Sequence, residues 1–311
     1  DLLYGVPVPT QTGVANATVT MNAASMDNSG FEFSATYRNH DHPFKYDVSA
    51  NLSTLKNKVT SLGFGTTSYI TGAYATYVGQ EIGQFYGWVY EGIARTQSDL
   101  DNHATQQGAN IGDCLYKDIS GPNGEPDGVI DAYDQTVLGS GLPKVNFGLS
   151  AHMEYKNFDL SISTYGVLNY HVSDDIYNSL NSCYGWGNKD VAMADANRFS
   201  EDGSTYLSSV PRTYAANKAT LAWNDLFSSR KIQNAAYWKI ANVELGYNFP
   251  DQWFRGLVSG VRVYVSAQNL YTFTGYKGYN VDYAGGTFTP GYNFCSFPSA
   301  RSFMAGLHFT F

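Results

Sequence analysis

The sequence lacks any run of eighteen or more apolar residues, which excludes a transmembrane helix. A membrane barrel stays open, because barrel strands carry a much weaker hydropathy signal than helices do. Charged residues are scarce, at 15% of the 311 residues, and the formal net charge of −8 includes no basic cluster, which argues against nucleic acid as a partner. Glycine and aromatic residues are abundant instead, with 31 Gly and 25 Tyr, as is common in all-β proteins with many turns.

Cysteine is also scarce and catalytic motifs are missing. Cys114, Cys183 and Cys295 form no CxxC pair, which argues against zinc and dithiol redox chemistry. Three is an odd number, so at least one is free or pairs outside this chain, and one disulfide among them is compatible with an oxidising compartment. The sequence has no Gly-x-Ser-x-Gly, His-Glu-x-x-His or phosphate-loop motif, so we expect no enzyme. No signal peptide starts at Asp1, and we expect a mature or cleaved fragment.

Seven segments alternate apolar and polar residues with the period of two that a β-strand with one apolar face requires. In the last of them Phe303, Leu307 and Phe309 share a face, and the sequence ends on Phe311 of the same face. The predicted strands are 31–37, 44–53, 145–155, 158–163, 241–249, 261–268 and 301–311.

Alternation alone also fits a soluble β-sandwich or a small ligand-binding barrel. Two features favour a membrane barrel. Short links at 39–43, 156–157 and 250–260 alternate with three much longer connections. Outer-membrane barrels typically have such short turns on the periplasmic side and long loops on the extracellular side. Apolar positions beside the short links are aromatic, as in an interfacial girdle. These aromatic residues are Tyr37, Phe44, Tyr155, Phe158, Phe249 and Phe311.

This pattern predicts a topology for the whole chain. Residues 1–28, 54–144, 169–236 and 275–299 are expected to be extracellular, and the short turns periplasmic. Seven strands cannot close a barrel of even strand number, so the rest of the wall must come from preceding sequence.

Several longer motifs resemble the late strands of SusC/RagA-type TonB-dependent transporters, in chain order over essentially the whole chain. Two examples are Gly79-Gln-Glu-Ile-Gly-Gln-Phe-Tyr-Gly87 and Val261-Arg-Val-Tyr-Val-Ser-Ala-Gln-Asn-Leu-Tyr-Thr-Phe-Thr274. The remaining matching stretches are 22–33, 46–59, 116–118, 127–134 and 298–307.

The resemblance implies an all-β fold, namely the C-terminal portion of a large 22-stranded antiparallel transmembrane β-barrel, with the plug domain and the earlier strands absent from this chain. It further implies import of large nutrients, glycans or oligopeptides, across the outer membrane of a Gram-negative bacterium. The implied partners are a SusD-like surface lipoprotein, the remainder of the transporter, outer-membrane lipid and the TonB complex, which acts through the absent N-terminal part. The alternative is a soluble lectin-like or adhesin β-sandwich that serves as a binding module.

An acidic stretch has the spacing of a calcium-binding loop, with Gly128 at the sixth position, where the chain must turn sharply. Asn in place of the first Asp, Pro126, and Asp134 in place of a closing Glu depart from the pattern. The alternative is an acidic surface turn. No cofactor is required, and the expected ligands of a structural Ca²⁺ or Mg²⁺ are Asn123, Glu125, Asp127, Val129 (through its carbonyl), Asp131 and Asp134.

Two further sets of residues are candidates for contact with cargo. Tyr184, Trp186 and Trp223 lie in the long 169–236 loop and could stack on sugars or peptide side chains, or anchor the loop to itself. The charged residues on the polar strand faces are expected to form ionic networks at the lumen wall rather than to bind substrate. They are Glu32, Arg38, Lys45, Asp47, Glu154, Glu244 and Arg262.

Overall fold

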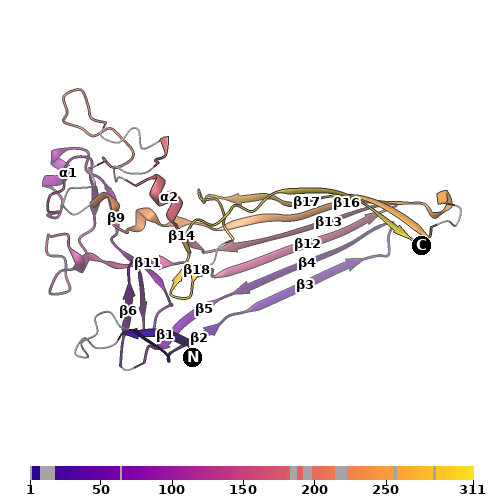
Figure 1. Ribbon diagram of the computed structural model, residues 1–311, viewed down its shortest axis with the longest axis horizontal. Helices are drawn as coiled ribbons and strands as arrows, with labels where there is room; N and C mark the ends of the chain where they lie inside the picture. The colour runs from indigo at the N-terminus through magenta and orange to yellow at the C-terminus, as the bar shows by residue number, and fades with distance from the viewer. Residues whose placement is uncertain are drawn as a thin grey trace.

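The computed structural model describes residues 2–7, 18–63, 65–182, 188–191, 198–213, 223–254, 258–282 and 285–311. Its largest element is an antiparallel sheet of seven strands in the order β21-β17-β16-β13-β12-β4-β3, which we call the wall (Figure 1). The strands are β3 (Glu32–Asn39), β4 (Phe44–Thr54), β12 (Val145–Tyr155), β13 (Phe158–Leu168), β16 (Tyr237–Phe249), β17 (Gly260–Thr274) and β21 (Ser302–Thr310). All seven predicted strands are confirmed. Within the described residues, β3 and β21 have no partner on their outer sides, so the wall is open.

The wall exposes its apolar face, whereas a sheet in a soluble protein buries its apolar face. Large apolar side chains on one face are exposed, among them Phe303 at 70% and Leu307 at 63%. The other face is polar, and some of its side chains, Asp159, Lys239 and Ser266 among them, are buried. A soluble protein rarely leaves such a long apolar surface in water, whereas a barrel wall presents it to lipid.

Strands β16 and β17 are longer than predicted, because each continues past a β-bulge that interrupts its alternation. Ala241 is an extra residue in β16, since Asn242 faces Ser163 on β13 while Ile240 faces Thr164. A second bulge in β17 includes Asn269, whose φ of 51° is left-handed. The single extra residue in β16 puts residues 237–240 out of phase with the rest of the strand, whereas β17 has two extra residues, Asn269 and Leu270, and keeps its alternation. Trp238 and Phe273 therefore belong to the apolar face, where their rings stack at 5.2 Å.

Connections at one end of the wall are short, and most of the remaining chain lies at the other end (Figure 1). The turn from β12 to β13 has two residues, and Lys156 in it adopts a φ of 54°. The link from β16 to β17 contains the 3₁₀ helix η6 (Asp251–Phe254). The predicted asymmetry of the links is thus present.

The hairpin of β3 and β4 continues beyond the wall as the pair β2 (Thr18–Ser29) and β5 (Lys56–Ser61). Gly30 lies at the junction, where the backbone of Thr54 occupies the space that a Cβ atom would need. β1 (Leu2–Pro7) pairs with the far side of β2. The predicted loop 1–28 therefore contains regular strand structure.

Short elements fill the end of the molecule opposite the short turns. One sheet has the order β11-β8-β7-β6, another β15-β14-β20, and β10 pairs with β9 and β18 with β19. The strands are β6 (Ser68–Thr71), β7 (Tyr74–Tyr77), β8 (Gln84–Gly87), β9 (Tyr90–Ile93), β10 (Cys114–Tyr116), β11 (Thr136–Ser140), β14 (His171–Asp174), β15 (Gln233–Asn234), β18 (Gly285–Gly286), β19 (Thr289–Pro290) and β20 (Tyr292–Asn293). The helices are α1 (Gln97–Asp101), α2 (Asp175–Leu180), η2 (Ala132–Asp134), η4 (Trp223–Asp225) and η5 (Ser229–Lys231).

Small apolar cores hold these elements together, because long connections need buried contacts of their own. One core includes Val172 and Tyr276, a second includes Val59 and Leu62, and a third is formed around Tyr116. Among the described residues, no helix is both long and apolar enough to cross a membrane.

Candidate functional site

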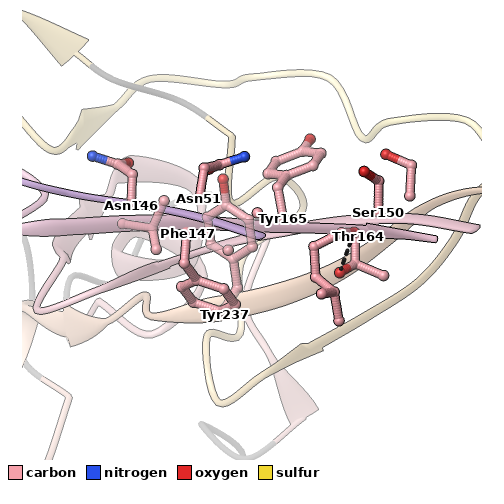
Figure 2. A pocket seen from close by; sticks show the side chains of 12 residues that line it. Asn51, Asn146, Phe147, Ser150, Thr164, Tyr165 and Tyr237 are labelled. Atoms are coloured by element: carbon pink, nitrogen blue, oxygen red, sulfur yellow. Dashed lines mark hydrogen bonds between the residues drawn. The ribbon is translucent and has the colours of Figure 1, made fainter. Parts of the chain in front are cut away.

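The polar face of the wall carries a cavity of about 530 Å³ near the end that meets the short elements. Figure 2 shows the side chains of Asn51, Asn146 and Tyr165 on one side of the strands and the Phe147 ring on the other. Strand register explains the grouping, because Gly148 on β12 lies directly between Asn51 on β4 and Tyr165 on β13. The lining residues are Asn51, Asn146, Phe147, Gly148, Leu149, Ser150, Ser163, Thr164, Tyr165, Gly166, Val167 and Tyr237. We call this hollow the wall cavity.

Small residues and aromatic rings give the wall cavity its shape. A Cβ atom on Gly148 would lie 2.8 Å from Asn51 Nδ2, so only glycine leaves the amide where it is. The rings of Tyr165 and Tyr237 meet edge to face at 6.0 Å. The side chains of Asn51 and Asn146 have no hydrogen-bond partner in the described part of the chain. The lining thus offers free amides, hydroxyls and ring faces but no charge, which suits neutral ligands rich in hydroxyl or amide groups.

An ion pair between a buried lysine and a partly exposed aspartate closes one side of this region. Lys239 on β16 lies in the same register row as Tyr165, and its ammonium is 2.5 Å from the carboxylate of Asp282. The Tyr165 hydroxyl donates a 3.3 Å hydrogen bond to the other oxygen of Asp282. A smaller cavity of about 260 Å³ lies beside the pair, and its lining includes Tyr165, Tyr237 and Val281. The chain after β17 is therefore tied to the polar face of the wall.

Charged residues near the short turns pair with one another. Arg262 on β17 donates hydrogen bonds to both oxygens of Asp159, at 2.5 and 3.1 Å, and to Glu244 at 2.7 Å. Asn248 adds a 2.9 Å hydrogen bond to Asp159. Gly246 makes the network possible, since a Cβ atom there would lie 2.6 Å from Arg262 Nε.

The other charged residues of the polar face follow the same rule. Arg38 pairs with Asp47 at 3.8 Å, and Lys45 pairs with Glu154 at 4.0 Å. These pairs agree with the predicted ionic networks, whereas Glu32 has no ion-pair partner among the described residues. Most charges of the polar face are thus paired within the wall, whereas the uncharged wall cavity has free amide groups.

Trp223 lies in the core around Tyr116. It is 4% exposed, and its indole Nε1 donates a 2.9 Å hydrogen bond to the carbonyl of Gln107. Its own carbonyl accepts a hydrogen bond from the Tyr116 hydroxyl. This position favours the anchoring interpretation of Trp223 over direct ligand contact. Tyr184 and Trp186, the other two predicted aromatic contacts, lie outside the described residues.

Carboxylates of the acidic loop are engaged by the backbone. Asp134 is fully buried and accepts hydrogen bonds from the amides of Ile119, Ser120 and Asp131, at 2.8, 3.2 and 2.8 Å. Asp131 caps η2 by accepting from the Tyr133 amide. Asn123, Glu125 and Val129 are exposed, and Asp127 accepts from the Val129 amide at 3.0 Å. In the part of the chain that is described, no three His, Cys, Asp or Glu side chains are placed to hold a metal ion. Ion binding by this loop stays a prediction.

Sequence reasoning missed the residues of the wall cavity. Asn51, Asn146 and Tyr165 occupy polar positions of predicted or extended strands, but only the strand register shows that they are neighbours. Tyr237 and Lys239 precede the bulge at Ala241, so simple alternation left them outside the predicted strand. The available signal was Gly148, a glycine inside a strong strand pattern, which often marks close approach of another group.

Comparison with known proteins covers the whole chain. No family model matches it. It is 30% identical to TonB-dependent receptor P3 of Formosa agariphila over 331 residues, covering 100% of this chain and 31% of the relative. It is 27% identical to TonB-dependent receptor SusC of Bacteroides thetaiotaomicron, with 100% and 29% covered. The chain spans about a third of the length of the curated relatives it matches.

Solved structures agree in fold. The RagAB peptide transporter superposes with a TM-score of 0.76 at 22% identity, covering 100% of this chain and 32% of that one. The closed-closed state of the RagAB peptide importer gives a TM-score of 0.77 at the same identity and coverage. These relatives are receptors and transporters rather than enzymes. In sequence the chain thus matches the C-terminal portion of SusC-type TonB-dependent receptors, and in fold it matches the same portion of the RagAB β-barrel.

Proposed function

We propose that this chain is part of the wall of an outer-membrane importer that takes up large nutrients, glycans or oligopeptides, in a TonB-dependent manner. The observation that carries the proposal is the chemistry of the two wall faces, one of which exposes large apolar side chains while the other carries polar and charged ones, some of them buried. In a barrel the apolar face contacts lipid and the polar face lines the lumen. A soluble lectin-like sandwich would instead bury its apolar face against a second sheet.

The remaining parts of the transport machinery belong to the proposal as well. The open edges of β3 and β21 require strands from the rest of the receptor. The resemblance to SusC/RagA-type transporters supports a SusD-like surface lipoprotein at the extracellular mouth and energy input from the TonB complex through the rest of the receptor. The wall cavity supports contact with a hydrated, uncharged part of the cargo, because its free amides and rings match sugar hydroxyls and peptide groups alike.

Uptake by cells that carry the complete receptor tests the proposal. A strain without the receptor is supplied with the unaltered gene or with Asn51→Ala and Asn146→Ala variants, and uptake of fluorescent glycan and oligopeptide pools is compared. We expect the deletion to abolish uptake of one pool, a protonophore to do the same, and the variants to reduce it several-fold. Thr36→Ala is the matched control. Among the described residues, the Thr36 hydroxyl bonds only to that of Ser49, on the same face and outside the cavity.

Two results would overturn the proposal. One is recovery of the receptor in the soluble fraction without detergent, which the exposed apolar face forbids. The other is uptake of both pools that is unchanged by the deletion.

A further inference from the structure

A third cavity, of about 350 Å³, lies where α2, η5, β15 and the chain after β17 meet. Its charged lining consists of Arg230 and Lys277, with no carboxylate among the lining residues. In a chain with a net charge of −8, two cations around a hollow without an acidic residue are unusual. The lining residues are Tyr177, Arg230, Gln233, Asn234, Ala236, Gly275 and Lys277. We call it the cationic cavity.

Neither cation is neutralised by a described residue. Within the described residues, Arg230 and Lys277 have no salt bridge, although most Lys and Arg side chains of the wall do. Lys277 instead extends over the ring of Tyr177, with Nζ 5.9 Å from the ring centroid. This contact holds the ammonium at the rim without supplying a negative charge.

Gln233 contributes a hydrogen-bond donor to the same cavity. Its Oε1 accepts a 3.0 Å hydrogen bond from the backbone amide of Lys277, which fixes the orientation of its side-chain amide. Its Nε2 is then left buried with no partner in the described part of the chain. A buried donor without an acceptor is costly, by roughly 1–3 kcal/mol, so a bound oxygen atom at this place would relieve it.

We propose that the cationic cavity binds an oxyanion, a carboxylate or sulfate group, through Arg230, Lys277 and the Gln233 amide. Guanidinium and ammonium groups form charge-assisted hydrogen bonds to such oxygens, which are about twice as strong as neutral ones. The ligand oxygen also satisfies Gln233 Nε2. The wall cavity is uncharged, so the two hollows divide ligand recognition between neutral and anionic groups.

Titration calorimetry on the purified complete receptor in detergent tests the proposal, with sodium sulfate and sodium acetate as probes and ionic strength held by chloride. We expect binding of at least one anion, and a loss of affinity of about tenfold or more in Arg230→Gln and in Lys277→Gln. Lys117→Gln is the matched control, because it removes one exposed lysine outside the cavity and should leave the affinity unchanged. Arg230→Lys retains the charge and should keep part of the affinity.

A second variant leaves both cations in place. A Cβ atom on Gly275 would meet no atom within 4 Å, so Gly275→Glu can be accommodated and puts a carboxylate at the cavity. It should compete with the anion and weaken binding to a similar degree. Tighter binding of sulfate would assign a tetrahedral group, and tighter binding of acetate a planar carboxylate. Equal affinities in all variants, or no binding of either anion to the unaltered receptor, would overturn the proposal whatever the uptake experiment gives.

Discussion

Lys239 in the wall and Asp282, 43 residues later, form a salt bridge in which Nζ lies 2.5 Å from Oδ2. The Lys239 side chain is only 4% exposed, so its charge depends on this one carboxylate for compensation. Removing one member of a buried pair leaves the other uncompensated, which costs more than the pair itself contributes. Together with the buried side chains of Tyr276 and Val281, the pair therefore holds the chain after β17 on the polar face.

We expect Asp282→Asn to detach this chain segment from the wall. The unpaired Lys239 costs about 3 kcal/mol in this setting, enough to make the docked segment much less populated. Limited proteolysis of the complete receptor should then cut within residues 275–282 much faster than in the unaltered protein.

Lys45→Met is the control for this experiment. It breaks a pair with Glu154 in which both side chains are about half exposed, and such pairs contribute about 0–1 kcal/mol. Equal protease sensitivity in the two variants would show that Lys239 and Asp282 do not hold the segment.

A second prediction concerns Gly246, which lies against the Arg262 network. Gly246→Ala places a Cβ atom 2.6 Å from Arg262 Nε and against the Asp159 carboxylate, so the ion pair must move. We expect a loss of about 1–3 kcal/mol, as for overpacking elsewhere. Gly260→Ala is the matched change on the next strand, where the nearest atoms of Thr310 are 3.7 Å away and no loss is expected. The temperature at which the receptor loses its heat-modifiable gel mobility compares the two, and equal temperatures would contradict the prediction.

The alternation of the sequence predicted the seven wall strands because lipid and lumen impose opposite chemistry on the two faces of every strand. It could not predict the first residues of β16 or the last of β17, since the bulge at Ala241 shifts the alternation by one residue and Asn269 and Leu270 interrupt it in β17. Only the apolar pair of Tyr271 and Phe273 beyond the second bulge hinted at the extension. Most strands in the regions assigned as loops have two to six residues, too few to show a period, whereas β2, with twelve residues, is an exception.

The candidate site was less predictable than the fold. The wall cavity gathers residues from β4, β12, β13 and β16, and the cationic cavity joins α2 to a segment about 100 residues later. Neither grouping leaves a local motif. For Trp223 the sequence leaves two roles open, because an aromatic residue in a long loop gives the same pattern whether it contacts a ligand or packs in a core. The structure places it in a core.

The two described cysteines should differ in reactivity. Cys114 is fully buried, and burial raises the pKa of its thiol to about 12, so little thiolate exists at pH 8. Cys295 is exposed. In the complete receptor with Cys183→Ser, we expect iodoacetamide at pH 8 to label Cys295 and to spare Cys114 until the protein is denatured. Mass spectrometry of the labelled peptides checks this, and equal labelling of both residues in the folded receptor would contradict it.

Asp134 in the acidic loop has one observed role, as an acceptor of backbone hydrogen bonds, and one predicted role, as a metal ligand. As the acceptor of three backbone amides, Asp134 is needed for loop structure whether or not an ion is present. Asp134→Ala leaves those amides without an acceptor, and we expect hydrogen exchange at Ile119, Ser120 and Asp131 to accelerate by at least tenfold, since one buried unsatisfied group costs about 1–3 kcal/mol.

Hydrogen exchange also tests whether the acidic loop binds calcium. Asn123, Glu125 and Asp127 lie at the exposed tip of the loop, and carboxylates so close in sequence repel one another without a cation. If they close around Ca²⁺, exchange across 123–131 should slow on addition of calcium to the complete receptor and recover with a chelator, while the wall strands stay protected by their own ladders. Glu125→Gln with Asp127→Asn should remove the calcium effect and leave the amides bonded to Asp134 protected. Exchange that is indifferent to calcium in the unaltered receptor would exclude the metal site and leave Asp134 as a structural cap.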